Sequence, residues 1–270
     1  MRPQWIALAG WAIVGTLLFV SGAAADDFDT CDQQSGDVAI AACTRGITSG
    51  EYSGDRLAVL YNDRGVEYQN KGDLDRAIAD YGEAIKDNPK FIRAYENRIK
   101  ANVKKGEYDR AFADYSAVIE LDPSFANFIN RGMLYFEHGR YNLAIADDSE
   151  AIRLSPKEPF GWLNRCEAYV IQNTLQDALS DCNRSLELAN VPETRRVRGI
   201  IYTKLGRYQL AISDFNDAIK AVPDFAEAFY ARGVAKLKSG DERGGQADMA
   251  KAQSMNAHVS EDFKKYGLAL

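Results

Sequence analysis

The sequence has little of what nucleic-acid-binding proteins require. Of its 270 residues, 33 are Lys or Arg and 39 are Asp or Glu, which gives a net charge of -6. Affinity for DNA or RNA depends on basic side chains that release counterions from phosphates. The acidic balance therefore argues against a nucleic-acid partner. Proline is also scarce, with seven residues, and this scarcity favours an array of short helices.

Motifs of the common catalytic and cofactor sites are missing as well. The sequence has no GxSxG, P-loop or HExxH motif. Of the two histidines, His138 adjoins Gly139 at a predicted turn and His258 lies near the C-terminus. Neither has a Cys, Asp or Glu at the spacing of metal ligands. We expect no enzymatic activity, metal or cofactor, although a fold by itself never excludes catalysis.

The first 25 residues differ from the rest in composition. A positive end at Arg2 precedes an apolar run, Trp5 to Val20, and the small residues that end at Ala25. This order is typical of a secretory signal, so we expect cleavage after Ala25 and a periplasmic or secreted protein. The alternative is an uncleaved inner-membrane anchor, because residues 5–25 carry no charge and are long enough to span a bilayer. A membrane partner is expected only in that case.

Export makes the four cysteines informative, since disulfides persist in oxidising compartments. Cys31 and Cys43 are close in sequence, and Cys166 and Cys182 form the other local pair. Three pairings are formally possible, and we expect this local one. A redox-active pair is the alternative, but no CxxC motif occurs, and no neighbouring His or Lys is present to lower a thiol pKa.

From residue 58 onward the chain repeats every 33 or 34 residues. Six predicted units span 58–91, 92–124, 125–158, 159–191, 192–225 and 226–257. The clearest copy, residues 195–223, predicts two short helices with a break at Gly206 and a stop at Pro223. A position near the middle of each first helix, such as Gly65 or Gly199, is usually small, and so is one twelve residues later, such as Ala211. Small residues at both points let the two helices approach closely.

The two ends of the array are predicted to be capped. Residues 26–34 are acidic and are expected to be a loose start, followed by a helix over 36–47 that aligns with a second helix. Residues 26–57 thus form an N-terminal capping half-repeat. Residues 258–270 hold a C-terminal cap, with a polar-faced closing helix expected over 260–268. Terminal units of a solenoid are expected to be atypical in this way.

The register also aligns charges and cysteines. An Arg precedes the small position in each unit, and an Asp follows sixteen residues after that Arg, as in Arg198 and Asp214. These positions are symmetric about the turn of the hairpin, so we favour an Arg–Asp pair inside each hairpin over a basic stripe for an acidic ligand. Cys166 and Cys182 obey the same symmetry one residue further on, so they are expected to form a disulfide across the fourth hairpin.

The repeated unit resembles the tetratricopeptide repeat family. The first unit matches the family signature at Tyr61, Gly65, Tyr68, Ala77, Tyr81, Ala84 and Pro89. The resemblance covers about residues 58–257 and implies an all-α, right-handed solenoid of six helical hairpins. Departures occur where Asp148 and Cys182 replace the aromatic residue of the second helix.

The resemblance also implies a groove lined by first helices. The family position two residues before the small one is Asn97, Asn130 and Asn164 in three consecutive units. An amide offers a donor and an acceptor to an extended peptide; the alternative is that these residues only cap or solvate their helices. Further groove positions are Arg93, Lys100, Arg196 and Lys204, with apolar contacts expected from Phe136, Phe160 and Val170. The carboxylate-clamp subtype is not expected, because Asn62 and Val66 stand where it needs Lys and Asn.

We therefore expect an exported scaffold that binds a peptide or helix of another protein in its concave groove. The alternative is a membrane-anchored scaffold for envelope assembly that binds through its convex face or its ends. Capture of an acidic side chain or a C-terminal carboxylate by the basic groove residues is expected in the first case.

Overall fold

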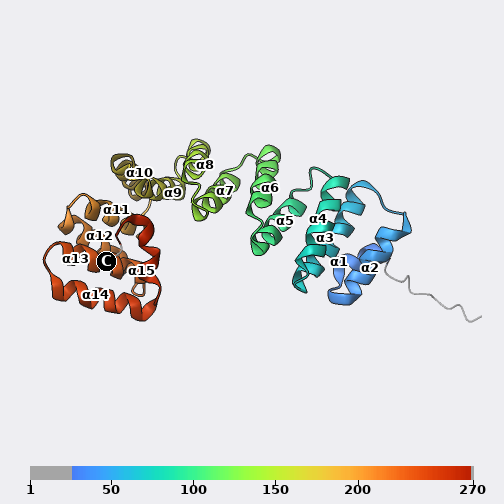
Figure 1. Cartoon of the computed structure of the whole chain (residues 1–270). Helices are drawn as coiled ribbons and strands as arrows, with labels where there is room; N and C mark the ends of the chain where they lie inside the picture. Colours follow the sequence, from blue (N-terminus) through green and yellow to red (C-terminus); the bar gives the residue numbers. More distant parts are fainter. Residues whose placement is uncertain (1–25, 269–270) are drawn as a thin grey trace, which may run out of the picture. The chain divides into compact units, whose positions relative to one another are not determined.

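The computed structural model describes residues 26–268. This part of the chain is built from α-helices and one short 3-10 helix, η1, without a β-strand (Figure 1). The helices are α1 Asp27–Gln33, α2 Gly36–Ser49, α3 Gly54–Asn70, α4 Leu74–Asp87, α5 Ile92–Lys105, α6 Tyr108–Leu121, α7 Phe125–Glu137, α8 Tyr141–Leu154, α9 Pro159–Ile171, α10 Leu175–Leu188, α11 Pro192–Lys204, α12 Tyr208–Ala221, α13 Ala226–Lys238, α14 Glu242–Met255, α15 Val259–Asp262 and η1 Lys264–Tyr266. The expected all-α fold of repeated helical hairpins is confirmed. The proposed cleavage site after Ala25 lies outside the described residues.

The chain divides into two compact units between Ala94 and Tyr95. Helices α1 to α4 belong to the first unit, and α6 to α15 with η1 belong to the second. Within each unit, odd-numbered helices from α3 onward are the first helices of hairpins and even-numbered ones are the second helices. The candidate site described below lies in the second unit.

Glycines inside the hairpins allow the close helix approach that the sequence predicts. A Cβ atom placed on Gly199 of α11 would lie 2.5 Å from the ring of Phe215 on α12. A Cβ on Gly65 would lie 2.7 Å from the ring of Tyr81 in the same way. Such distances are below van der Waals contact, so a bare backbone here lets the aromatic ring of the second helix pack against the first helix.

The ends of the second helices follow the proline pattern. Four second helices end two residues before Pro89, Pro123, Pro156 and Pro223. The residue before a proline is excluded from the helical region, and proline itself has no amide hydrogen to donate. These prolines therefore prevent the four helices from continuing, although α10 and α14 have the same length of 14 residues without a proline at this place.

The N-terminal cap differs from the expected one at its start. Residues 27–33, predicted to be loose, form the helix α1, whose N-cap Asp26 accepts a hydrogen bond from the Asp29 backbone. Cys31 and Cys43 form a disulfide that joins α1 to α2, and Arg45 of α2 pairs with Asp27 at 2.6 Å. The composition of this stretch is polar, so its helical state depends on the cap, on these cross-links and on the packing of Phe28 and Cys31 against α2 and α3.

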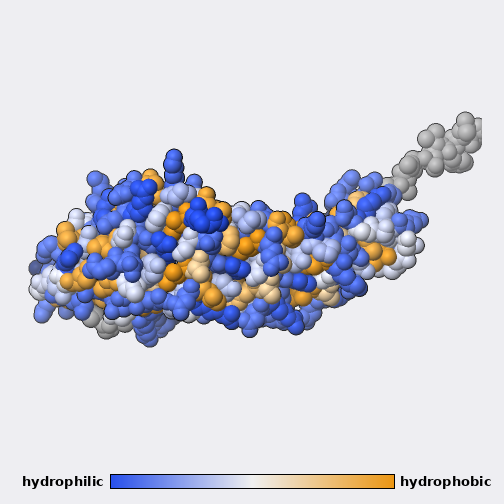
Figure 2. Space-filling model, turned by 90° about the horizontal axis from the view of Figure 1, so that it is seen from above, coloured by the Kyte–Doolittle hydropathy of each residue, from blue (hydrophilic) through white to orange (hydrophobic). Residues whose placement is uncertain are grey.

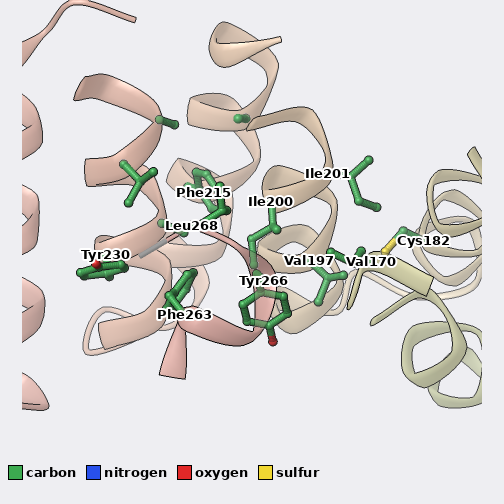
Figure 3. Close-up of a cluster of buried hydrophobic side chains, with 14 of the residues drawn as sticks. Val170, Cys182, Val197, Ile200, Ile201, Phe215, Tyr230, Phe263, Tyr266 and Leu268 are labelled. Carbon is green, nitrogen blue, oxygen red and sulfur yellow. The ribbon is translucent and has the colours of Figure 1, made fainter. Parts of the chain in front are cut away.

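The C-terminal segment also differs from the expected one. It is a four-residue helix, α15, followed by η1, rather than one closing helix over 260–268. Phe263, Tyr266 and Leu268 are buried with Ile200 of α11 and Tyr230 of α13 in the core of the second unit (Figure 3). The closing segment therefore presents an apolar face to the first helices and exposes Asp262, Lys264 and Lys265 on the other side. The prediction of one continuous helix over 260–268 was wrong.

Candidate functional site

The repeated Arg–Asp pairs are internal to the hairpins. In all six hairpins the Nε and Nη2 atoms of the arginine donate to the two carboxylate oxygens of the aspartate sixteen residues later, with the shortest contact at 2.6 or 2.7 Å. The aspartates are buried. This bidentate geometry is the strong form of the pair, and the prediction of a structural Arg–Asp pair is confirmed.

Several of these arginines also connect one hairpin to the hairpin before it. The Nη1 atom of Arg131 donates to the Ser116 hydroxyl at 2.8 Å, and that of Arg165 donates to the Ser149 hydroxyl at 3.0 Å. Arg198 makes the equivalent bond to Asn183 at 2.9 Å. The arginine row therefore holds adjacent hairpins in register, and its donors are used within the protein.

The three asparagines lie at equivalent places on their first helices, α5, α7 and α9. Asn97 and Asn164 are half-buried and Asn130 is exposed. Asn130 and Lys100 line a cavity of about 170 Å³ together with Tyr115, whereas Asn164 lines a different cavity. Arg93 is exposed in the first turn of α5. The asparagines thus share a register, but Asn130 and Asn164 belong to two separate cavities.

The cavity at Asn164, which we call the α7–α9 pocket, has a volume of about 250 Å³. Its lining residues come from α7, α8, α9 and the C-terminal segment, and they are Gly132, Met133, Phe136, Glu137, Asp148, Asn164, Glu167 and Lys265. Three of them carry carboxylates and two carry large apolar side chains. The pocket therefore combines apolar walls with negative charge, and one cation, Lys265, lies at its edge.

Large apolar side chains are exposed beside this pocket. Met133 is 48% exposed and Phe160, on the first turn of α9, is 52% exposed. Hydrophobic side chains reach the surface in Figure 2 as separate patches among hydrophilic ones. By contrast Val170, expected to contact a ligand, is fully buried in the core of the second unit. We call the surface formed by Asn130, Met133, Phe136, Phe160 and Asn164 the first-helix face.

Asp148 is the most unusual group of the pocket. Its side chain is 2% exposed, and its Oδ1 atom has no hydrogen-bond partner among residues 26–268. Burial raises the pKa of Asp148 to about 8, and the neighbouring Asp147 charge adds to this, whereas Arg165 and the Asn164 amide act to lower it. The sequence marked Asp148 as a departure from the repeat pattern. It carried no signal that the departure opens a pocket.

Arg196 and Lys204 were expected to face a ligand, but both are engaged by other residues of the protein. The Nη2 atom of Arg196 pairs with the Glu167 carboxylate at 2.9 Å, its Nη1 donates to the Tyr266 hydroxyl, and Lys204 donates to the Tyr266 carbonyl at 3.0 Å. The hydroxyl of Tyr266 in turn donates to Glu167. Burial alone would raise the pKa of Glu167, but Arg196 and the Tyr266 hydroxyl outweigh it and lower that pKa.

This correction has a physical reason. Arg196 and Lys204 do project from the face of α11 that the register assigns to the groove, but the C-terminal segment covers that face. Phe263, Tyr266 and Leu268 of that segment pack in one core with Val197, Ile200 and Tyr230 (Figure 3). The face of the first helices is therefore occupied by the chain itself at α11 and α13.

The structure joins Cys166 to Cys182 across the fourth hairpin, with the two Cα atoms 5.5 Å apart. Both residues are fully buried in the core of the second unit. Their side chains occupy the place that Gly199 and Phe215 fill in the next hairpin. The cross-link thus replaces the ring packing seen in the first and fifth hairpins.

Residues 26–268 offer neither a metal site nor a membrane span. Within them, His, Cys, Asp and Glu side chains form no group that could hold a metal ion. The helices of the same residues include none that is long and apolar enough to cross a membrane.

Two segments of the chain match models of the tetratricopeptide repeat, residues 62–124 and residues 199–240. Mouse superkiller complex protein 3 is 30% identical over 115 residues, which is 42% of this chain and 7% of that protein. Human tetratricopeptide repeat protein 13 is 31% identical over 109 residues, which is 40% of this chain and 13% of that protein. The chain thus spans a small part of the length of these relatives.

Solved structures show the same fold. A tetratricopeptide repeat protein from Parabacteroides merdae superposes with a TM-score of 0.59 at 20% identity, covering 85% of this chain and 91% of that one. PilW, a type IV pilus biogenesis factor, gives a TM-score of 0.59 at 19% identity, covering 77% and 97%. YrrB, described as a repeat protein with an unusual peptide-binding site, gives 0.50 at 23% identity, covering 68% and 97%. The chain is therefore an all-helical array of hairpins in which two segments match the tetratricopeptide repeat.

Proposed function

We propose that this protein binds a peptide or a helix of another protein on the first-helix face of α7 and α9. The observation that carries the proposal is the α7–α9 pocket, which opens beside the exposed side chains of Met133 and Phe160. Exposed apolar groups rimmed by polar ones are typical of interaction surfaces. Tetratricopeptide repeats mediate protein–protein interaction, and YrrB carries a peptide-binding site.

The polar groups of this face fit a main-chain ligand. Asn130 is exposed and Asn164 is half-buried, one helical hairpin apart. Each amide can donate to a peptide carbonyl and accept from a peptide N–H, so the contacts would not depend on the sequence of the partner. The corresponding face of α11 is covered by residues 263–268, which limits the proposed surface to the hairpins before it.

A site-specific photo-crosslinker tests the proposal. The photoreactive residue is placed at Phe160, which is 52% exposed, and, as a matched control, at Leu210 on α12, which is 50% exposed. We expect a discrete partner adduct from position 160 in cells that make the protein. Combining the crosslinker with Asn130→Ala and Asn164→Ala is expected to remove the adduct while leaving the far-UV circular dichroism unchanged.

The control position distinguishes the two modes of binding. Leu210 lies on a second helix, so an adduct from position 210 and none from 160 would replace the proposal by the alternative scaffold that binds through its second helices. Equal adducts from both positions would also contradict the proposed binding face. The two positions are similarly exposed, so equal crosslinking would indicate non-specific contact.

We also propose that the protein acts in an oxidising compartment after export. Two disulfides in a chain of this size support the proposal, because such bonds are rare where thiols are kept reduced. The mass of the protein purified from its native cells tests it. A chain that starts at Asp26 supports cleavage and a periplasmic or secreted protein, whereas a chain that retains Met1 supports a membrane anchor.

A further inference from the structure

We infer that the α7–α9 pocket is a subsite for a lysine side chain of the bound partner, with Asp148 as the acceptor for its ammonium group. The inference rests on the proposed function and adds to it the chemistry that the partner must carry. It is argued below from the origin of the pocket, the state of Asp148 and the charges around it.

The pocket exists because Asp148 is too small to fill the third hairpin. The equivalent second-helix residues of the other five hairpins are Tyr81, Tyr115, Cys182, Phe215 and Met249. The Tyr81 and Phe215 rings lie close against Gly65 and Gly199 and leave no room there. In the third hairpin Gly132 faces the shorter Asp148 side chain instead, and both residues line the pocket.

The Asn164 amide bonds to the Asp148 carboxyl group, but one oxygen of that group is buried without a partner. The Oδ1 atom lies 3.2 Å from the position of a Cβ on Gly132, at the pocket wall, and has no hydrogen-bond partner among the described residues. A buried polar atom without a partner costs about 1 to 3 kcal/mol. An ammonium group placed at this atom supplies the missing partner and stabilises the ionised carboxylate, so its binding releases the proton that the buried Asp148 carboxyl otherwise holds. An apolar group does neither, so the pocket selects ammonium over apolar groups.

The charges around the pocket favour a cation as that donor. The carboxylates of Glu137 and Glu167 also line the pocket. Glu167 is already paired with Arg196, so the Glu137 carboxylate adds to the attraction for a cation and disfavours an anion. The ring of Phe136 offers a π face, and the Nζ atom of Lys265 lies 5.2 Å from its centroid. A lysine of the chain itself therefore already has its ammonium group at the edge of this pocket.

Lysine fits the single acceptor better than arginine does. A guanidinium group is recognised best by two parallel acceptor oxygens, whereas an ammonium group is a compact point charge. Arg196 and Tyr266 engage Glu167, which leaves Asp148 Oδ1 as the unsatisfied buried atom. The apolar side chains of Met133 and Phe136 would cover the methylene stem of the lysine.

The test uses the full chain and two small probes that differ only at the end of the side chain. Nα-acetyl-L-lysine methylamide carries the ammonium group, and Nα-acetyl-L-norleucine methylamide is the matched apolar control. The reporter is the methyl group of Met133 in protein labelled with ¹³C at its methionine methyls, which gives a simple spectrum because the chain has four methionines. We expect the lysine probe to shift the Met133 signal and to bind about tenfold or more tightly than the norleucine probe.

Two variants assign the binding to Asp148. Asp148→Asn keeps the size of the side chain and is expected to weaken the lysine probe about tenfold. Asp148→Phe restores the ring of the other hairpins and is expected to abolish binding by filling the pocket. The dispersion of the methionine signals reports whether this variant folds; if it does not, Asp148→Asn carries the test.

Equal binding of the two probes, or an unchanged affinity in Asp148→Asn, would overturn the inference. Neither result would affect the adduct at position 160, on which the proposed function depends. Conversely, loss of that adduct together with selective binding of the lysine probe would overturn the proposed function and leave the lysine subsite standing as a small-molecule site.

Discussion

Arg196 of α11 pairs with Glu167 of α9 at 2.9 Å, and both side chains are bonded to Tyr266 of the C-terminal segment. Arg196 and Glu167 thereby connect two neighbouring hairpins. The third group, Tyr266, lies 99 positions after Glu167 in the sequence. A buried ion pair of this kind gains from every additional hydrogen bond that satisfies its atoms. The C-terminal segment therefore completes the second compact unit and is part of its core.

The first prediction concerns this segment. Tyr266→Ala removes a ring that is 2% exposed and leaves Arg196 and Glu167 without their shared partner, so we expect the free energy of unfolding to fall by about 3 kcal/mol. Trypsin should cleave the variant faster after Lys264 and Lys265, since the segment is released more often. Urea unfolding and timed proteolysis measure the two effects.

Matched variants separate the ring from its hydroxyl. Tyr266→Phe keeps the packing and is expected to lose about 1 kcal/mol, while Lys264→Ala changes an exposed neighbour and should leave stability unchanged. A Tyr266→Ala protein that unfolds at the same urea concentration as the parent would show that the segment only rests on the surface.

The second prediction concerns the Arg–Asp row. Asp181→Ala deletes a buried carboxylate and leaves the guanidinium of Arg165 without its partner, so we expect a loss of about 2 to 3 kcal/mol, below the range for fully buried pairs because Arg165 is partly exposed. The control is Glu150→Ala, which breaks an exposed pair with Arg153 and should change stability by less than about 0.5 kcal/mol. Equal effects in urea unfolding would contradict a structural role for the row.

The repeat register was predictable because it is a local property. Gly65, Gly199 and the arginines recur at a fixed spacing, and helix geometry turns that spacing into facing positions within one hairpin. The Arg198–Asp214 pair could therefore be predicted from symmetry about the turn alone. Contacts within a hairpin follow from its own 34 or so residues.

The contacts of the C-terminal segment were not predictable by the same means. Tyr266 is one of two aromatic residues in a polar stretch. Its partners lie on α9 and α11, outside any repeat relation with it. The register assigned Arg196 and Lys204 to the groove side of α11, but it carries no information about a segment that folds back and bonds to them. The pocket at Asp148 was not predictable for a related reason. Its volume depends on side chains from α7, α8, α9 and the C-terminal segment, which the repeat pattern does not relate to one another.

The third prediction concerns the disulfides. Non-reducing peptide mapping should find Cys31 linked to Cys43 and Cys166 linked to Cys182. Replacing Cys166 and Cys182 together by Ala should lower stability by about 3 kcal/mol in the chain-entropy model for a loop of 16 residues. The equivalent replacement at Cys31 and Cys43 is expected to raise hydrogen exchange mainly in α1 and α2. Four free thiols in protein from an oxidising compartment would contradict the pairing.

The last prediction concerns the pH dependence that Asp148 imposes. Burial raises the pKa of its carboxyl from 3.8 to about 8, so the folded protein holds this proton over a range in which the unfolded chain has lost it. Ionisation then stabilises the unfolded chain relative to the folded one, and stability falls as pH rises between these two values. The charges that act on the group are Asp147, Arg165 and Asp181, and Asn164 bonds to it.

Asp148→Asn removes this dependence, because the amide is neutral at every pH. The difference in unfolding free energy between Asp148→Asn and the parent should therefore grow in favour of the variant from pH 5 to pH 8, by up to about 1.4 kcal/mol per pH unit, and level off above the folded-state pKa. Urea unfolding of both proteins at matched pH values measures the difference, in which contributions from all other groups cancel. A difference that stays constant over this range would show that Asp148 is ionised in the folded protein, and the pocket would then hold a permanent negative charge.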